Sequence, residues 1–276
     1  MKLSLHSQFD PATFTVTYVV WHPRTRAAVI IDSVLDYDPA TQLTSRQSTD
    51  KLISFIKEKD LRVEWILETH AHADHLSAAR ELREALPGSR WAMGRRMTEV
   101  FDTFKKVFAW PAGLTIQQLG VDRWLGDGEE IALDGFTIQA IETPGHTPAC
   151  MTFKIGEWLF TGDALFMPDS GVGRCDFPGG SAGTLYDSIW AKLYAYPDHF
   201  QVFTGHDYQP GGRPVRFQAS LGEEKQGNVH LRSDLTRADF VAFREGRDKT
   251  LSAPRLLQPR LDWNLGAHQI VKRLKA

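Results

Sequence analysis

The sequence predicts an α/β fold, and three observations lead to this class. The chain has 276 residues, which is enough for one large α/β domain or two small ones with a substantial core. Short β-rich runs alternate with segments in which apolar residues recur every three or four positions. Metal-ligand side chains follow the ends of several of these runs, and ligand sites gather at strand ends in open α/β sheets.

The first half of the chain alternates expected strands and helices. Residues 36–48 are polar and contain Pro39, so we expect a loop between the second strand and the first helix. The expected elements of this half are strands over residues 14–20, 27–32 and 63–67, and helices beginning at Ser48 or Thr49 and spanning 75–86 and 94–108.

The second half contains a strong hairpin signal, because Asp134-Gly135 favours a type I′ turn between two β-rich runs. Residues 169–183 are rich in glycine and polar residues and predict a long ordered loop. The other expected elements are strands over 129–133, 136–141, 151–155, 158–161 and 201–204, and helices over 184–195 and 238–247. No repeat or clean linker divides the chain, so we expect one domain over 1–276 with 211–276 as a C-terminal extension packing on it.

Composition limits the function classes. Hydrophobic residues make up 42% of the chain and charged residues 24%, which is typical of a globular protein. The net charge of −2 gives no electrostatic support for nucleic-acid binding. Two cysteines, Cys150 and Cys175, do not make a disulfide framework, and no apolar run approaches the ~20 residues of a spanning helix. We therefore expect a soluble cytoplasmic protein that binds neither nucleic acid nor membrane.

One six-residue stretch carries most of the functional signal. His70, His72, Asp74 and His75 place four potential ligands directly after an apolar run. Neutral imidazole and carboxylate bind borderline divalent metals, so the stretch predicts a metal site. The alternative is a polar loop whose histidines only cap the following helix.

Three later positions repeat this placement. His146, Asp163 and His206 each follow an expected strand, and each is preceded by glycine, which lets the backbone turn sharply and approach an ion. Each position alone is weak, because a Gly-His pair is commonly only a turn. Together with the six-residue stretch they indicate a single site.

These residues carry a family resemblance. His-x-His-x-Asp-His, Pro-Gly-His-Thr, Thr-Gly-Asp and Gly-His, in this order, resemble the metallo-β-lactamase superfamily over roughly residues 12–210. The resemblance implies an αββα four-layer sandwich, in which helices flank two mixed β-sheets and the metal site lies at one sheet edge.

Within the superfamily, the sequence is most similar to the bacterial form of the persulfide dioxygenase branch. The likeness rests on the segments 69–75, 161–165, 173–177, 185–188 and 205–208. It implies that His70, His146 and Asp163 bind one Fe(II) per chain. His72, Asp74, His75 and His206 would then form a supporting shell or a vacant second metal site. Val172 stands where some members carry cysteine, so a thiol role is not transferred to this position.

The resemblance implies oxidation of glutathione persulfide by O₂ to sulfite and glutathione. Two histidines and one carboxylate leave coordination positions open for sulfur and dioxygen. A sulfurtransferase of the rhodanese type is an expected partner, and a homodimer is the default expectation for the oligomer. One alternative is a dinuclear zinc thioester hydrolase of the glyoxalase II type that uses all seven residues. Another is a non-catalytic metal sensor.

Several residues are candidates for the substrate pocket. Arg174 is expected to brace its loop through a carboxylate such as Asp176, and a direct role in the substrate pocket is the alternative. Tyr208 is expected either to hydrogen-bond near the open metal positions or to be a packed residue. Glutathione has two carboxylates that arginine recognises well. The corresponding candidates are Arg213, Arg216 and Lys225, and the preferred interpretation of any one of them alone is part of a solvated basic face. Cys175 lies beside Arg174, which favours a lowered pKa, whereas the preferred interpretation of both cysteines is small buried filler.

Overall fold

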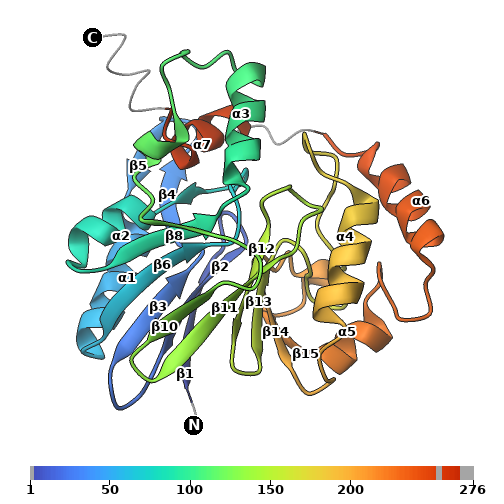
Figure 1. Ribbon diagram of the computed structural model, residues 1–276, viewed down its shortest axis with the longest axis horizontal. Helices are drawn as coiled ribbons and strands as arrows, with labels where there is room; N and C mark the ends of the chain where they lie inside the picture. The colour runs from blue at the N-terminus through green and yellow to red at the C-terminus, as the bar shows by residue number, and fades with distance from the viewer. Residues whose placement is uncertain (1–2, 253–256, 268–276) are drawn as a thin grey trace. The chain divides into compact units, whose positions relative to one another are not determined.

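The computed structural model describes residues 3–252 and 257–267, and the chain divides into two compact units (Figure 1). Unit 1 comprises Met1–Trp124, Leu133–Gly135 and Ala253–Ala276, and unit 2 comprises Leu125–Ala132 and Phe136–Ser252. The expected C-terminal extension, 211–276, is thus shared between the units, and the single-domain organisation stays a prediction. In the described part of the chain, no helix has the length and apolar character needed to cross a membrane.

Unit 1 is built on a mixed six-stranded sheet. In spatial order its strands are β1 (Ser4–Asp10), β2 (Thr15–Trp21), β3 (Ala27–Ile31), β6 (Arg62–Glu68), β8 (Arg90–Gly94) and β9 (Arg123–Leu125). The first three strands pair antiparallel, whereas β3, β6 and β8 pair in parallel. All of β3 is buried, as expected for a continuous apolar run inside a sheet. Because parallel strands end at the same edge, Asp32 after β3 and the loop after β6 come together.

In the described part of unit 1, a small sheet and four α-helices accompany the six-stranded sheet. The sheet has the order β5 (Leu43–Ser45), β4 (Val34–Asp38), β7 (Leu76–Ser77). The helices are α1 (Gln47–Glu58), α2 (Ala79–Ala85), α3 (Met97–Val107) and α7 (Leu257–Asn264), with a 3₁₀ turn η1 at Ile116–Leu119. In α1 the buried residues Leu52, Ile53 and Ile56 confirm the expected helical spacing.

Two expectations for unit 1 are wrong. Residues 36–48 are not a plain loop, because β4 and β5 form an antiparallel hairpin in which Asp36 is paired with Ser45 and Pro39 lies in the turn. The helix expected over 75–86 begins only at Ala79, because Leu76–Ser77 pairs with β4 as β7.

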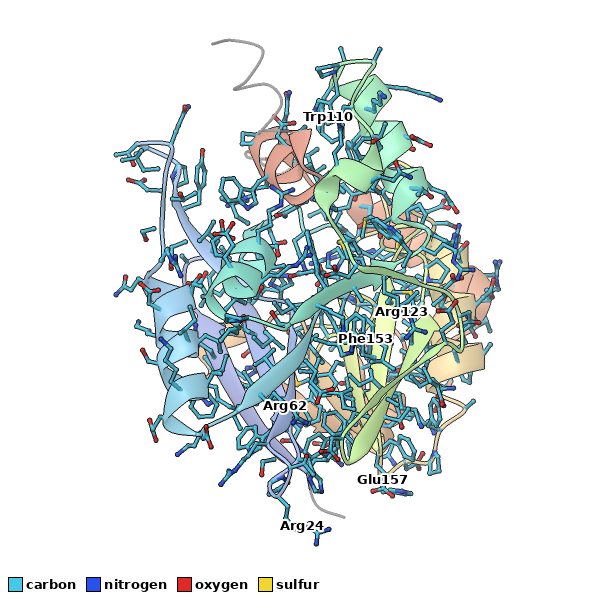
Figure 2. All side chains as sticks on the ribbon, turned by 60° about the vertical axis from the view of Figure 1, so that its left-hand side comes forward. Arg24, Arg62, Trp110, Arg123, Phe153 and Glu157 are labelled. Carbon is cyan, nitrogen blue, oxygen red and sulfur yellow. The ribbon has the colours of Figure 1, made fainter. Side chains whose placement is uncertain are left out.

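Unit 2 is also built on a mixed six-stranded sheet. Its strands, in spatial order, are β10 (Glu130–Leu133, whose last residue falls in unit 1), β11 (Phe136–Glu142), β12 (Met151–Ile155), β13 (Trp158–Gly162), β14 (Gln201–Thr204) and β15 (Gln218–Ser220). Figure 2 shows Phe153 of β12 within the mass of side chains, whereas Glu157 lies at the surface. Since β13 and β14 are parallel, Asp163 and His206 follow strand ends at one edge.

The helices of unit 2 enclose their own core. They are α4 (Ala182–Ser188), the π-helical turn η2 (Ile189–Leu193), the 3₁₀ turn η3 (Pro210–Gly212), α5 (Leu221–Gly227) and α6 (Arg237–Asp248). Leu185, Ile189, Leu193 and Phe240 are fully buried together. The expected hairpin forms between β10 and β11, but its turn is not type I′, because only Gly135 has a positive φ, of 106°, and type I′ needs two such residues.

Candidate metal centre

The loop after β6 brings His70, His72, Asp74 and His75 together in unit 1. One ligand atom from each of His72, Asp74 and His75 lies within 4.8 Å of the others. The ring centroids of His70 and His72 are 4.2 Å apart, and those of His72 and His75 are 4.1 Å apart. All three imidazoles are buried. Three buried imidazoles and the partly exposed Asp74 therefore lie together in this unit, as the spacing of the stretch predicts.

His72 is oriented by two buried carboxylates. Its Nε2 lies 2.9 Å from Oε2 of Glu68 and 3.2 Å from Oδ1 of Asp32. Since carboxylates accept hydrogen bonds, Nε2 carries the proton and the lone pair of the neutral ring is on Nδ1. Within residues 3–252 and 257–267, this buried Nδ1 has no hydrogen-bond partner. A histidine that donates to carboxylate through one nitrogen and offers the other is a typical metal ligand, so the residues fit a metal.

The same carboxylates determine the charge of His72. Burial disfavours the imidazolium, but Asp32 and Glu68 outweigh it and raise the pKa of His72 well above its ordinary value. Burial also opposes charge on Asp32, yet His72 and Thr69 hold the pKa of this carboxyl below its usual range. A cation bound at Nδ1 takes the place of the second ring proton, so metal binding to this histidine releases a proton.

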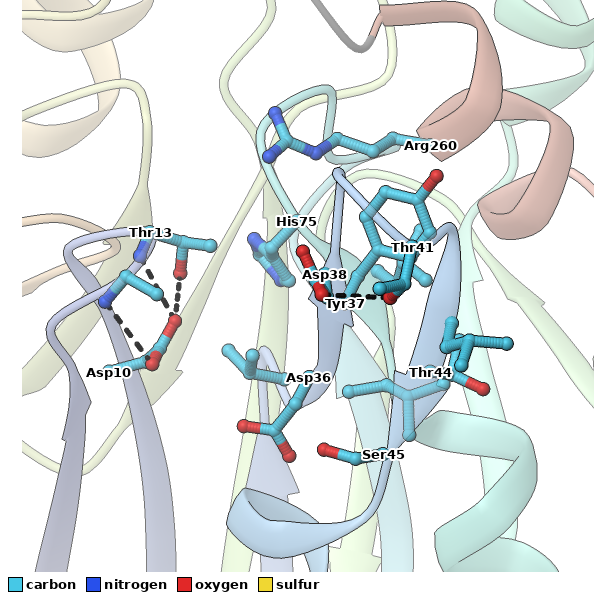
Figure 3. A pocket seen from close by; sticks show the side chains of 15 residues that line it. Asp10, Thr13, Asp36, Tyr37, Asp38, Thr41, Thr44, Ser45, His75 and Arg260 are labelled. Carbon is cyan, nitrogen blue, oxygen red and sulfur yellow. Dashed lines mark hydrogen bonds between the residues drawn. The ribbon is translucent and has the colours of Figure 1, made fainter.

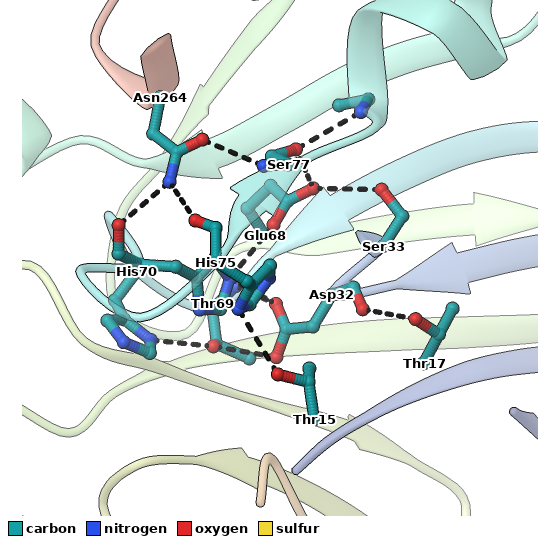
Figure 4. Close-up of polar contacts among 12 residues, drawn as sticks. Thr15, Thr17, Asp32, Ser33, Glu68, Thr69, His70, His75, Ser77 and Asn264 are labelled. Atoms are coloured by element: carbon teal, nitrogen blue, oxygen red, sulfur yellow. Dashed lines mark hydrogen bonds and ion pairs between the residues drawn. The ribbon is translucent and has the colours of Figure 1, made fainter. Parts of the chain in front are cut away.

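Asp32 also orients His70 through Thr69 (Figure 4). The Thr69 amide donates to Oδ1 of Asp32 at 2.7 Å, and the Thr69 hydroxyl donates to Oδ2 at 2.8 Å. Because its hydrogen is used there, the hydroxyl oxygen accepts from Nδ1–H of His70, 3.0 Å away. The lone pair of His70 is thereby placed on Nε2, the atom that a metal would bind.

A distant residue holds the backbone of this loop. Asn264, in α7, donates from Nδ2 to the carbonyls of His72 at 2.7 Å and His75 at 2.8 Å, and its Oδ1 accepts from the Ser77 amide at 2.8 Å. Glu68 adds a further bond, because it accepts from the Ser77 hydroxyl at 2.6 Å. Figure 4 shows Asn264 and Ser77 beside the ligand loop.

Sequence reasoning missed these supporting residues as a group. The available signals were Glu68 at the end of one apolar strand and Asp32 at the end of another, where an aspartate is more often a turn former. Nothing in the sequence connects Asn264 with a loop almost 190 residues earlier.

Unit 2 contains a second cluster, centred on Asp163. Its Oδ2 lies 3.6 Å from Nε2 of His146, and its Oδ1 lies 3.3 Å from Nε2 of His206. Nδ1 of His146 is 2.6 Å from the carbonyl oxygen of Arg174, which can only accept, so Nδ1 carries a proton. In the neutral ring the Nε2 lone pair then faces a carboxylate. Two acceptors that face each other suit a cation between them.

Glycine permits the backbone geometry of this cluster. Gly145 has a φ of 146°, and a Cβ there would lie 2.4 Å from the Cα of Leu185. Gly162 has a φ of 51°. A Cβ on Gly205 would meet Oδ1 of Asp163 at 3.0 Å. Glycine before each of these ligands was expected from the sequence, and a positive φ or a close approach explains it at all three positions.

Arg174 and Tyr208, the expected pocket residues, lie beside the ligands of unit 2. Arg174 binds both oxygens of Asp176, each at 2.6 Å, as the brace interpretation predicts. Its guanidinium also lies over the ring of Phe177, which stands edge-on to His146 at 5.3 Å between centroids. Tyr208 stacks on His206 at 5.5 Å and is 49% exposed. A substrate role for either residue stays a prediction.

The three candidate cations for the substrate are already paired within unit 2. Arg213 binds both Asp169 and Asp207. Arg216 pairs with Glu223, and Lys225 pairs with Asp198. Their substrate role stays a prediction that the geometry does not favour, because these carboxylates occupy the donors that a substrate would need.

Both cysteines are buried. Burial raises the pKa of the Cys175 thiol, and Asp248 adds to the effect, so a lowered pKa at this position is wrong. The preferred interpretation as small buried residues agrees with this environment.

Comparison with known proteins places these motifs in a family. Residues 10–206 match the model of the metallo-beta-lactamase superfamily. A Burkholderia pseudomallei protein named as a probable metallo-hydrolase is 42% identical over 97% of this chain and 94% of its own length. Glyoxylase B2 of Dictyostelium discoideum is 37% identical over 98% and 91%. The human mitochondrial persulfide dioxygenase ETHE1 is 32% identical over 86% of this chain and 78% of its own.

A solved structure extends the comparison. The crystal structure of ETHE1 from Myxococcus xanthus has a TM-score of 0.75 at 28% identity and covers 95% of this chain and 98% of that one. Some relatives are longer: the chain spans 59% of a Xylella fastidiosa protein named beta-lactamase hydrolase-like, with 41% identity. The two mixed sheets with flanking helices agree with these matches. The chain therefore belongs to the metallo-β-lactamase superfamily of metal-dependent enzymes.

Proposed function

We propose that this protein is a persulfide dioxygenase. It converts glutathione persulfide, O₂ and water into glutathione, sulfite and two protons. The terminal sulfur loses four electrons and dioxygen accepts them, so no further oxidant is needed. A cytoplasmic location, a homodimer and a rhodanese-type sulfurtransferase as partner belong to the same proposal.

One observation carries the proposal beyond the superfamily. The segment Gly173-Arg174-Cys175-Asp176-Phe177 is one of the stretches by which the sequence resembles persulfide dioxygenases, and it packs directly on His146. The carbonyl of Arg174 accepts from this histidine, and the ring of Phe177 contacts it edge-on. A segment that sets the orientation of a ligand is where a difference in chemistry between branches would be encoded. Similarity to two proteins named ETHE1, over most of the length of each, supports the same branch.

In this proposal His70, His146 and Asp163 hold one Fe(II). The ferrous ion would supply the redox chemistry that dioxygen needs, with open positions for two small ligands. The chain's own contribution is orientation: Thr69 directs Nε2 of His70, and the Arg174 carbonyl directs Nε2 of His146. His72, Asp74, His75 and His206 would support these ligands and the pocket.

A dinuclear zinc hydrolase is the second candidate, and a specific observation favours it. Asp163 presents one oxygen to His146 and the other to His206, which is the arrangement of a carboxylate shared by two ions. His72, Asp74 and His75 could complete the second ion's ligands. The names of two relatives, a probable metallo-hydrolase and glyoxylase B2, point the same way. Its substrate would be a glutathione thioester.

Anaerobic purification with metal counting separates the two functions. The dioxygenase predicts about one iron per chain and O₂ uptake with glutathione persulfide. The hydrolase predicts two zinc ions per chain and cleavage of S-lactoylglutathione without O₂ uptake, and this result would remove the dioxygenase proposal.

The variant His75→Ala distinguishes a centre with one metal ion from a centre with two. A mononuclear dioxygenase keeps its iron, whereas a dinuclear hydrolase loses one ion. His199→Ala is the matched control, because the His199 side chain is 60% exposed, pairs with the exposed Glu157 and belongs to neither ligand cluster. The control should retain the full metal content of the wild type.

A further inference from the structure

We propose that a pocket in unit 1 beside His75 binds the zwitterionic α-amino-acid end of glutathione, with Arg260 receiving its carboxylate. The inference rests on the proposed use of a glutathione substrate. It applies to either candidate reaction, because the persulfide and the thioester carry the same γ-glutamyl group.

The pocket adjoins the ligand loop. It has a volume of about 440 Å³, within the range of small-molecule sites, and β4, β5 and the turn after β1 line it together with His75. Figure 3 shows Arg260 and Tyr37 on the side of the pocket that borders His75, while Asp10 and Asp36 line other sides. A molecule in this pocket therefore touches one of the candidate metal ligands.

Arg260, in α7, is the pocket's cation and has unused donors. Within residues 3–252 and 257–267 its guanidinium makes one hydrogen bond, a long one of 3.5 Å from Nη1 to the carbonyl of Ala73. Its Nε is buried without a partner. Arginine stays charged at neutral pH, and its planar fork matches a carboxylate in two places. An anion in the pocket would add partners for this guanidinium, which makes only the one long bond to Ala73 among the described residues.

Arg260 differs in this respect from the cations of unit 2. Arg213 is engaged by two carboxylates, and Arg216 and Lys225 are each engaged by one. A substrate carboxylate at any of those positions would have to displace an existing ion pair. At Arg260 it displaces none among the described residues, so Arg260 is the better recognition group.

The other pocket charges select a zwitterion rather than a simple anion. Among the residues that the structure describes, three carboxylates line the pocket: Asp10, Asp36 and Asp38. Each is held in place by neighbouring donors, namely Thr13 for Asp10, Ser48 for Asp36, and Ala40 and Thr41 for Asp38. Three negative groups and one positive group repel a plain carboxylate, whereas a ligand that pairs a carboxylate with an ammonium satisfies both signs.

Titration calorimetry on the metal-loaded full-length protein tests the inference without relying on catalysis. The probe is S-methylglutathione, whose blocked sulfur cannot act as a thiolate. We expect Arg260→Met to weaken its binding at least tenfold. N-acetyl-S-methylglutathione, which lacks the ammonium, should bind the wild type at least tenfold more weakly than the parent compound. Wild-type affinity in the variant, or equal affinity for the two ligands, overturns the proposal.

Two further variants control for folding and for charge. Arg232→Met removes the same charge from a side chain that is 57% exposed and paired with Asp234, so its affinity should equal that of the wild type. Arg260→Lys keeps the cation but loses the fork, and we expect about threefold to tenfold weaker binding. If circular dichroism shows that Arg260→Met does not fold, the test rests on Arg260→Lys. An Arg260→Lys variant that binds S-methylglutathione as tightly as the wild type would then reject the role of Arg260.

Kinetics separate this inference from the proposed function. With glutathione persulfide, Arg260→Met should raise KM at least tenfold and leave kcat within about twofold, while KM for 2-mercaptoethanol persulfide stays unchanged. An equal rise in KM for both substrates contradicts recognition of the amino-acid end. If no persulfide supports O₂ uptake by the wild type, the dioxygenase proposal fails. The binding of S-methylglutathione still shows whether the pocket recognises the amino-acid end of glutathione.

Discussion

The two ligand clusters are supported in different ways. In unit 1, side chains position the ligands: Asp32 and Glu68 bind His72, and Asn264 holds the backbone of the loop. In unit 2, the backbone positions them: a carbonyl orients His146, and glycine at 145 allows the ligand segment to pass close to α4. Ligand geometry should therefore be sensitive to the loss of a distant side chain in unit 1 and to the gain of a methyl group in unit 2.

Two buried glutamates show the same contrast. Glu68 in unit 1 accepts hydrogen bonds from Ser33, Ser77 and His72. Glu224 in unit 2 is equally buried, but among the described residues only Asn228 donates to it, and one of its oxygens has no partner. Burial therefore dominates and raises the pKa of Glu224 to about 8. Of these two buried glutamates, only the one beside the ligands of unit 1 has hydrogen bonds to both carboxylate oxygens.

Gly145→Ala should have the largest effect. The new Cβ would lie 2.3 to 2.5 Å from Cβ, Cα and N of Leu185, and the φ of 146° is unfavourable for alanine. Because backbone atoms cannot move aside cheaply, we expect a loss of at least about 4 kcal/mol in the free energy of unfolding, together with loss of bound metal. Urea unfolding and metal analysis measure both.

Gly156→Ala is the control for conformational strain alone. Gly156 also has a positive φ, of 59°, but a Cβ there meets nothing within 4 Å. Its cost should stay near 1 kcal/mol, the usual penalty for alanine in the left-handed region. Similar losses in the two variants would contradict the close approach to Leu185 as the cause.

Burial of Glu224 in unit 2 should make the free energy of unfolding depend on pH. Its pKa is about 8 in the folded protein and near 4.5 when exposed, so the folded state binds its proton more tightly. The resulting stability is fully present below pH 4.5 and is lost as the pH rises through 8. We expect the free energy of unfolding to fall by about 3 kcal/mol between pH 5 and 8 from this group. Denaturant unfolding at a series of pH values measures it.

Glu224→Gln should remove this dependence, because glutamine keeps the shape but does not ionise. The matched variant Glu223→Gln alters the neighbouring glutamate, whose pKa is lowered by its bonds to Ser220 and Arg216, and should keep the dependence. An unchanged pH profile in Glu224→Gln would assign the effect to other groups.

Elements that depend on neighbouring residues could be predicted from the sequence, whereas elements that depend on contacts with other parts of the chain could not. Local patterns predicted β2, β3 and β6, whose apolar runs are buried, and predicted α1 from its repeating apolar face. The β4–β5 hairpin was missed because the exposed strand β5 reads as polar loop, and its pairing depends on a partner several residues away. Turn type at Asp134-Gly135 also depends on surroundings that the dipeptide does not contain.

In the candidate site, the ligands could be predicted from local motifs, but the groups that orient them could not. The ligands are adjacent in sequence or follow glycine, so His70 and His146 could be found from local motifs. The groups that orient them could not, because Asn264 acts through tertiary contacts and Arg174 acts through its carbonyl oxygen, which every residue has. A hydrogen bond from a backbone carbonyl cannot be recognised in the sequence, because it does not depend on the residue type.

Asn264→Ala should have an intermediate effect that is specific to unit 1. The change removes three hydrogen bonds and leaves the Ser77 amide and two carbonyls buried without this partner. We expect a loss of about 2 kcal/mol in stability and a tenfold to hundredfold loss in metal affinity. Competition with a chelator measures the affinity. Asn264→Asp keeps the acceptor for Ser77 but not the two donors, so its affinity should lie close to that of the alanine variant.

Arg174→Lys should have the smallest effect and gives the sharpest test of the comparison. Lysine cannot make both bonds to Asp176, but the pair is partly exposed, so stability should fall by about 1 kcal/mol or less. The carbonyl that orients His146 remains in place, and metal affinity should stay within about threefold of the wild type. A loss as large as that in Asn264→Ala would mean that a side chain, rather than the main chain, positions the ligands of unit 2.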